Sequence, residues 1–241
     1  MLSKINFLEK LNQMLLNENL VEKEKERLER VIKHSDLLPE YISANILIEK
    51  LGLETIKGVT DEDGYYREFV NTIDNEDQES QTEIFYMLKS KQVSCLHALN
   101  TFETWHWLGG EDVLIFIFNK NNVSEIRLNA DMPKYTIPAN TIFGAKLFSN
   151  DSENLSWITC KCIPGFVPEL YKNPSPEDLE YLFETYPNYK QVIKELTPEN
   201  SKNNNIRRSI IHFFTCCFSC IGIKKIEEHE QTPLINPPRN N

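Results

Sequence analysis

Two histidines and one glutamate lie close together in the middle of the chain, just before a strongly apolar segment. His97, Glu103 and His106 have five and then two residues between them. Two imidazoles and one carboxylate suit a non-haem iron, manganese or zinc ion and leave coordination positions open for a substrate. On one straight strand His106 would point away from the other two, whereas a turn near residues 99–101 would bring all three together. The spacing therefore predicts a candidate site that depends on such a turn.

Two other interpretations of these residues stay open. They line a pocket for an organic ligand without a metal, or they only pair with one another inside a packed fold. If the protein is an enzyme, His97 or His106 is the expected general base, with its pKa tuned by Glu103. Trp105 offers an aromatic face to a sugar or base ring, although a tryptophan in such a position also packs as ordinary core.

A second group of candidate residues reads Tyr65-Tyr66-Arg67-Glu68. Strand alternation puts Tyr65 and Arg67 on one face and Tyr66 and Glu68 on the other. An inward Arg67 would clamp a carboxylate or phosphate with two parallel hydrogen bonds. The alternative is a structural ion pair with Glu103 or Glu68. Arg67 and Glu68 are therefore candidate ligand-binding residues.

The elements that must position these residues change in type along the chain. Residues 4–34 and 43–51 have helical apolar spacing, the second ending at Gly52. Ser175 followed by a proline and two acidic residues predicts a further helix start, with two short helices after it. Between these helices, short apolar runs separated by turn-forming residues predict an antiparallel sandwich or barrel. The predicted strands are residues 82–90, 92–99, 112–119, 124–130, 140–148 and 155–163, with 112–119 expected to be central and covered on both faces.

Composition narrows the classes of protein to consider. The 241-residue chain is 40% hydrophobic, with a net charge of −10 and a pI near 5.1. This balance argues against broad electrostatic binding of nucleic acid. The N-terminus is amphipathic and lacks the pattern of a signal peptide, so the six cysteines are expected to be reduced thiols.

Five segments together resemble one branch of the cupin superfamily, a domain of unknown function with an RmlC-like jelly roll. The resemblance covers about residues 40–197 and is specific, because the motifs agree in order and spacing. The segments are LGLETIKGVTDEDGYYREF (51–69), TFETWHWLGGEDVLIFIF (101–118), IPANTIFGAKLF (137–148), CKCIPGFVPELY (160–171) and YPNYKQVIKELT (186–197).

The resemblance implies a mainly β fold, a double-stranded β-helix that is often a homodimer, with a pocket in the barrel mouth. It implies either a divalent metal held by His97, Glu103 and His106, or metal-free epimerase chemistry with a histidine base and Tyr65 as the acid. Metal-binding cupins usually carry a further histidine in the second motif, where this chain has Ile142 and Phe143. Phe143 is therefore expected to line the pocket, and no particular metal is implied.

These observations predict three parts: an N-terminal helical extension (1–38), a cupin jelly roll (39–198) and a linker with a cysteine-rich apolar tail (199–241). The first functional hypothesis is binding of a small sugar-like or carboxylated ligand. The second is a metal-dependent or epimerase-type enzyme. The third is a catalytically inert dimerisation module. A homodimer that binds a small molecule and no nucleic acid is expected.

The tail contains an apolar run, residues 210–223, between two pairs of basic residues. The run is too short to span a bilayer but suits the membrane interface, and three of its cysteines are candidates for S-acylation: Cys216, Cys217 and Cys220. Residues 206–225 are therefore predicted to contact a membrane. Two alternatives stay open. The cysteines bind zinc together with His212, or the apolar run packs on the barrel or on a partner subunit.

A glutamate-rich cluster, EEHEQ, follows at residues 227–231. It is similar to the C-terminal signals of bacterial type IV-secreted effectors, although short acidic clusters are usually only solvating. The expected location is the cytoplasm or a membrane surface, with translocation into a host cell as an alternative.

Overall fold

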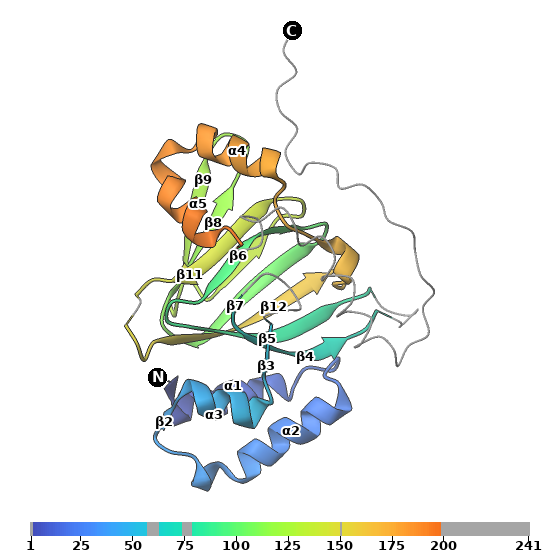
Figure 1. Cartoon of the computed structure of the whole chain (residues 1–241). Coiled ribbons are helices and arrows are strands. Elements are labelled where there is room, and N and C mark those ends of the chain that lie inside the picture. The colour runs from blue at the N-terminus through green and yellow to red at the C-terminus, as the bar shows by residue number, and fades with distance from the viewer. Residues whose placement is uncertain (1, 57–62, 74–78, 150, 199–241) are drawn as a thin grey trace.

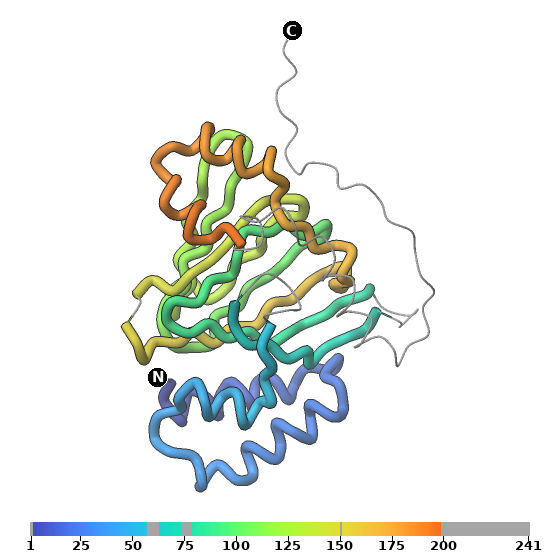
Figure 2. The backbone as a smooth tube through the Cα atoms, in the orientation of Figure 1, coloured from blue at the N-terminus to red at the C-terminus, as the bar shows by residue number. Residues whose placement is uncertain are grey.

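The computed structural model describes residues 2–56, 63–73, 79–149 and 151–198. Two antiparallel sheets face each other and form a mainly β double-stranded β-helix, with helices on the outside (Figure 1). Figure 2 shows the N-terminal helices in blue and the C-terminal helices in orange on opposite sides of the strands. The cupin jelly roll with helical extensions is therefore confirmed.

The helices are α1 (Lys4–Met14), α2 (Glu22–Lys33), α3 (Ala44–Leu51), α4 (Pro176–Thr185) and α5 (Lys190–Leu196). The strands are β1 (Leu2–Ser3), β2 (Tyr41–Ile42), β3 (Glu54–Thr55), β4 (Tyr65–Asn71), β5 (Thr82–Lys89), β6 (Val93–Leu99), β7 (Phe102–Gly110), β8 (Val113–Phe118), β9 (Val123–Leu128), β10 (Lys134–Ile137), β11 (Ile142–Leu147), β12 (Leu155–Ile163) and β13 (Tyr171–Lys172).

The strand order decides which segments lie side by side. One sheet has the order β10-β7-β12-β5-β4-β3, and the other has the order β13-β6-β11-β8-β9; β1 and β2 form a separate pair. Since side chains alternate between the two faces of a strand, each strand contributes one row to the interior between the sheets and one row to the outside.

The interior of the β-roll is largely apolar. Alternate residues of facing strands pack there into one buried cluster, which includes Tyr86, Trp105, Ile115, Phe143 and Ile158. Strand β8 sends Val113, Ile115 and Ile117 into this cluster and Phe116 and Phe118 to the opposite face. The prediction that residues 112–119 form a strand covered on both faces is therefore confirmed.

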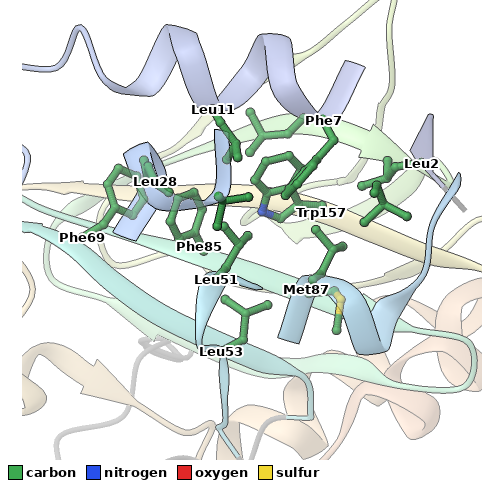
Figure 3. Packing of buried hydrophobic residues seen from close by; sticks show 14 of the residues in the cluster. Leu2, Phe7, Leu11, Leu28, Leu51, Leu53, Phe69, Phe85, Met87 and Trp157 are labelled. Carbon is green, nitrogen blue, oxygen red and sulfur yellow. The ribbon is translucent and has the colours of Figure 1, made fainter. Parts of the chain in front are cut away.

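The N-terminal helices cover the outer face of the six-stranded sheet. Ser3 caps α1, Ser43 caps α3, and α3 ends at Gly52, whose φ of +63° is left-handed and costs glycine little. The apolar sides of these helices share one core with the sheet, in which Trp157 packs on Phe7 and Phe85 (Figure 3). The sheet thus buries both of its faces.

The C-terminal helices cover the outer face of the five-stranded sheet. The Ser175 hydroxyl accepts from the Asp178 backbone N–H, and the Asp178 carboxylate accepts from the Ser175 N–H, so the predicted helix start is a capping box. Leu182 and Ile193 then pack on Leu96 and Phe116. Both short helices predicted after Ser175 are confirmed.

Candidate functional site

Two polar side chains lie deep between the sheets at one end of the roll. His97 on β6 is 3% exposed, and Glu103 on β7 is 8% exposed. His97 lies opposite Phe143 on β11, and Glu103 lies opposite Cys162 on β12. Since Phe143 belongs to the interior cluster and Glu103 shares the strand face of Trp105, both polar side chains face inward.

His97 is held between two aromatic rings. Its ring centroid lies 4.2 Å from that of Phe143 and 5.0 Å from that of Tyr171, with the Tyr171 ring stacked at 15°. Its Nδ1 lies 2.8 Å from the backbone oxygen of Cys95. Because a carbonyl oxygen only accepts, Nδ1 must carry the proton and donate it, which fixes the orientation of the imidazole.

Glu103 lies beside a thiol. Burial raises the pKa of Cys162, and the neighbouring Glu103 carboxylate raises it further. The thiol therefore stays protonated at neutral pH, and Cys162 is not suited to act as a nucleophile. Cys95 and Cys160 are also buried.

Aromatic rings continue from His97 across the interior to the opposite sheet. Trp105 meets Phe143 edge-on at 6.2 Å between centroids and meets Tyr86 edge-on at 5.8 Å. Tyr86 donates its hydroxyl to the backbone oxygen of Asp63 at 2.7 Å. The Trp105 Nε1–H is buried and has no acceptor within the part of the chain that the structure describes. The Trp105 N–H is thus a buried hydrogen-bond donor that a ligand oxygen could accept from.

A loop after β12 brings Tyr171 to His97. Pro164 accepts a hydrogen bond from the Thr101 hydroxyl at 2.6 Å, and the Phe166 N–H donates to the Thr82 hydroxyl at 2.9 Å. These bonds tie the loop to β5 and to the β6–β7 turn, and the chain then pairs with β6 as β13. Sequence reasoning missed Tyr171 as a site residue, because only this long-range pairing places it beside the imidazole.

The structure separates His106 from His97 and Glu103. A turn does occur between β6 and β7, but β7 is straight enough that Glu103 and Trp105 face inward while His106 faces outward. His106 lies opposite Lys134 on β10 and Thr159 on β12. The expected grouping of His106 with the other two residues, as metal ligand or base, is therefore wrong.

Arg67 and Tyr65 also lie on the outer face. Arg67 donates from Nε and Nη2 to the same Glu24 oxygen on α2, at 3.0 and 2.6 Å. Tyr65 packs against the N-terminal helical core, and its hydroxyl accepts from Lys89 Nζ at 3.1 Å. The prediction that Arg67 points inward and clamps a ligand is wrong. The alternative, a structural ion pair, is correct, but its partner is Glu24 and not Glu103 or Glu68. Tyr65 cannot meet either interior residue as a catalytic acid.

Glu68 has the opposite orientation. It lies across from Ile84 on β5, on the face that packs into the interior, at the solvent-exposed edge of that face. Partial burial raises the pKa of Glu68, while a hydrogen bond from Asn71 Nδ2 at 3.1 Å lowers it. The predicted alternation of residues 65–68 is confirmed, with Glu68 on the inner side.

The residues present do not fit the expected three-ligand metal site. Across the described ranges, no three or more histidine, cysteine, aspartate or glutamate side chains are grouped so that they could hold a metal ion. His97 and Glu103 face the interior, but His106 is on the other side of β7. The tail cysteines at 216, 217 and 220 lie outside the described residues.

Comparison with known proteins agrees with this fold. The family model described as cupin superfamily (DUF985) matches residues 45–172, more than half of the chain. A crystal structure of a protein from Shewanella oneidensis is 24% identical, covering 65% of this chain and 98% of that one, with a TM-score of 0.55. A hypothetical protein from Leishmania major is also 24% identical, covering 66% of this chain and all of that one, with a TM-score of 0.54. At this identity, the likeness to both structures establishes the fold alone.

No curated protein matches the chain. Oxalate decarboxylase from Bacillus subtilis is a more distant structural neighbour at 15% identity, covering 58% of this chain and 34% of that one, with a TM-score of 0.39. A likeness this remote has no bearing on activity.

Proposed function

Because the chain belongs to the cupin superfamily, in the family described as DUF985, we propose that it binds a small organic molecule at one end of its β-roll. The proposed site comprises His97 and Glu103 as polar contacts and Trp105, Phe143 and Tyr171 as aromatic contacts. These residues come from β6, β7, β11 and β13, so the strands of both sheets position the site.

The burial of two polar side chains in an apolar interior is the observation that carries this proposal. Burying an imidazole and a carboxylate costs free energy that aliphatic side chains in the same places would not cost. An inward His97 of fixed orientation and an inward Glu103 are therefore better explained by recognition of a ligand than by packing. The unsatisfied Trp105 N–H supports the same conclusion, because a bound oxygen atom would accept from it.

Binding is favoured over the epimerase-type alternative. The tyrosine expected as the acid for that chemistry, Tyr65, lies on the opposite side of its sheet from the interior. The metal-dependent alternative has lost one of its three expected ligands, His106. His97 and Glu103 are sufficient for hydrogen-bonded recognition without either reaction.

A thermal-shift screen of purified protein against sugars, polyols, sugar acids and nucleosides tests the proposal. A compound that binds the folded state raises Tm in a concentration-dependent way. Glu103→Gln and His97→Ala should abolish that shift, whereas His106→Ala, on the outer face of the same strand as Glu103, should retain it. The proposal is contradicted if no compound shifts Tm, or if the shifts survive both inner-face substitutions.

We also propose that residues 206–225 associate with a membrane surface. The support is their sequence: an apolar run with basic flanks and three cysteines suited to acylation. None of the helices in the described parts of the chain is long and apolar enough to cross a membrane. Location at a host membrane and self-association as a homodimer stay predictions, the latter to be tested by sedimentation velocity.

A further inference from the structure

We propose that the ligand is an uncharged, hydroxyl-rich molecule such as a neutral sugar, and that the site discriminates against its carboxylated analogues. This inference rests on the proposed function and specifies the class of ligand. It is supported by the orientation of the charged side chains: on the described strands, some acidic side chains face the interior, whereas the basic side chains face outward.

The inner faces of the described strands carry carboxylates and no lysine or arginine. Glu103 and Glu68 are the inward acids. The strand register places every basic residue of these strands on an outer face, where several have partners of their own. The outer basic residues are Arg67 with Glu24, Lys89 with Tyr65, Arg127 with Asp112, Lys146 with Glu195, Lys134 opposite His106, Lys161 opposite Thr104 and Lys172 opposite Ala98.

Arg67 matters most, because an arginine is the usual means of binding a ligand carboxylate. Its guanidinium is committed to Glu24, a side chain of α2 that is itself almost fully buried. Releasing Arg67 would leave the Glu24 charge without that partner, which is strongly unfavourable. Among the residues that the structure describes, no guanidinium is therefore available at the site for an acidic ligand.

An acidic ligand would also meet repulsion. A carboxylate brought next to Glu103 places two like charges in a region where water screens them poorly. Burial raises the pKa of the nearby Cys162 thiol, and the Glu103 carboxylate raises it further by disfavouring a second anion. A ligand carboxylate at the same place would be disfavoured for the same reason.

Hydroxyl groups are chemically suited to two inward polar groups, the Glu103 carboxyl group and the Trp105 N–H. A hydroxyl can donate to a carboxyl oxygen of Glu103, and its own oxygen can accept from the buried Trp105 N–H. The rings of Phe143, His97 and Tyr171 pack on one another, and Phe143 also meets Trp105 at 6.2 Å between centroids; aromatic rings suit the C–H face of a ring sugar. A neutral polyol therefore satisfies these groups without adding charge.

Titration with matched pairs tests the inference. Each pair differs only by a carboxylate: D-glucose against D-glucuronate, and D-galactose against D-galacturonate. Binding is followed through the indole N–H signal of Trp105, identified by its loss in Trp105→Phe, and through Tm. The neutral member of a binding pair should have a Kd at least tenfold lower at neutral pH and constant ionic strength.

Removing the inward charge should narrow this difference. Glu103→Gln keeps the size of the side chain and should reduce the ratio of the two Kd values severalfold. The matched control is Glu83→Gln, which removes an equal charge from the outer face of β5 and should leave the ratio unchanged. Circular dichroism of each variant establishes that it is folded.

The outcomes separate the two proposals. Equal or tighter binding of the acidic members overturns the inference while the proposed function stands. A neutral preference that Glu103→Gln does not alter also overturns it, because the charge would then not be the cause. If no member of either pair binds, the proposed function fails for the sugars tested and the inference fails with it.

Discussion

The Arg67 guanidinium lies 2.6 Å from the Glu24 carboxylate and joins the N-terminal helices to the sheet from the outside of the roll. The two residues are 43 positions apart in the sequence. The Glu24 side chain is only 3% exposed, and it also contacts Arg27 at 3.2 Å. A buried ion pair of this kind holds its partners in place more by the cost of breaking it than by its net gain.

Removal of Glu24 should therefore destabilise the protein. Glu24→Ala leaves Arg67 largely buried without its main acceptor, and the free energy of unfolding should fall by about 3 kcal/mol. Urea unfolding measures this, since urea does not screen charges. Glu54→Ala is the control, because Glu54 is 71% exposed and contacts Arg67 at 3.4 Å. Its effect should be below about 1 kcal/mol, and similar losses in both variants would contradict the expectation.

Replacement of His106 should change how stability depends on pH. Burial, together with the charges of Lys134 and Lys10, lowers the pKa of His106 to about 4 from its ordinary value of 6.5. Between these values the unfolded chain binds a proton that the folded protein does not, so stability is lost as the pH falls from 6.5 to about 4. In His106→Gln the free energy of unfolding should fall less steeply across this range. Parallel curves for the two proteins would refute the assignment.

The interior thiols should be slow to react in the folded protein. In a variant with Cys216, Cys217 and Cys220 replaced by serine, iodoacetamide should label the remaining thiols only after urea is added. Burial is the main cause of the raised Cys162 pKa and the Glu103 charge the smaller one, so Glu103→Gln should lower that pKa in part and speed the slow labelling of Cys162 in the folded protein. Peptide mass spectrometry separates the sites, with Glu83→Gln as the control. Unchanged Cys162 labelling in Glu103→Gln would argue against their proximity.

The tail proposal predicts acylation. In cells fed an alkyne-labelled palmitate analogue, the full chain should incorporate label and sediment partly with membranes. Triple replacement of the tail cysteines at 216, 217 and 220 by serine should abolish both. Replacement of the buried Cys160 by serine is the matched control and should abolish neither. Membrane sedimentation that persists without label would show that the apolar run suffices.

The strands and their facing could be predicted largely from the sequence. Two-residue alternation identifies β5, β6, β8, β9, β11 and β12 but misses β7 and β10, and it correctly separates Tyr65 and Arg67 from Tyr66 and Glu68. The candidate site was harder to predict. Whether His106 joins His97 depends on the course of the chain after the β6–β7 turn, and the partner of Arg67 comes from a distant helix.

Tyr171 is a second site residue whose position could not be predicted from local sequence. Nothing in its local sequence marks it as a neighbour of His97, because hydrogen bonds from Thr101 and to Thr82 set the course of the intervening loop. Local pattern determines which face of a strand a side chain occupies. The pairing of distant segments determines which side chains meet.

The shared core of Trp157 with Phe7 and Leu11 bears on how the protein can be shortened (Figure 3). The stretch matched by the family begins at residue 45, yet the sheet's aromatic outer surface is covered by helices that precede it. A fragment that begins at that boundary would expose an apolar surface rich in tryptophan and phenylalanine and should aggregate on expression. A shortened chain should therefore retain both α1 and α2.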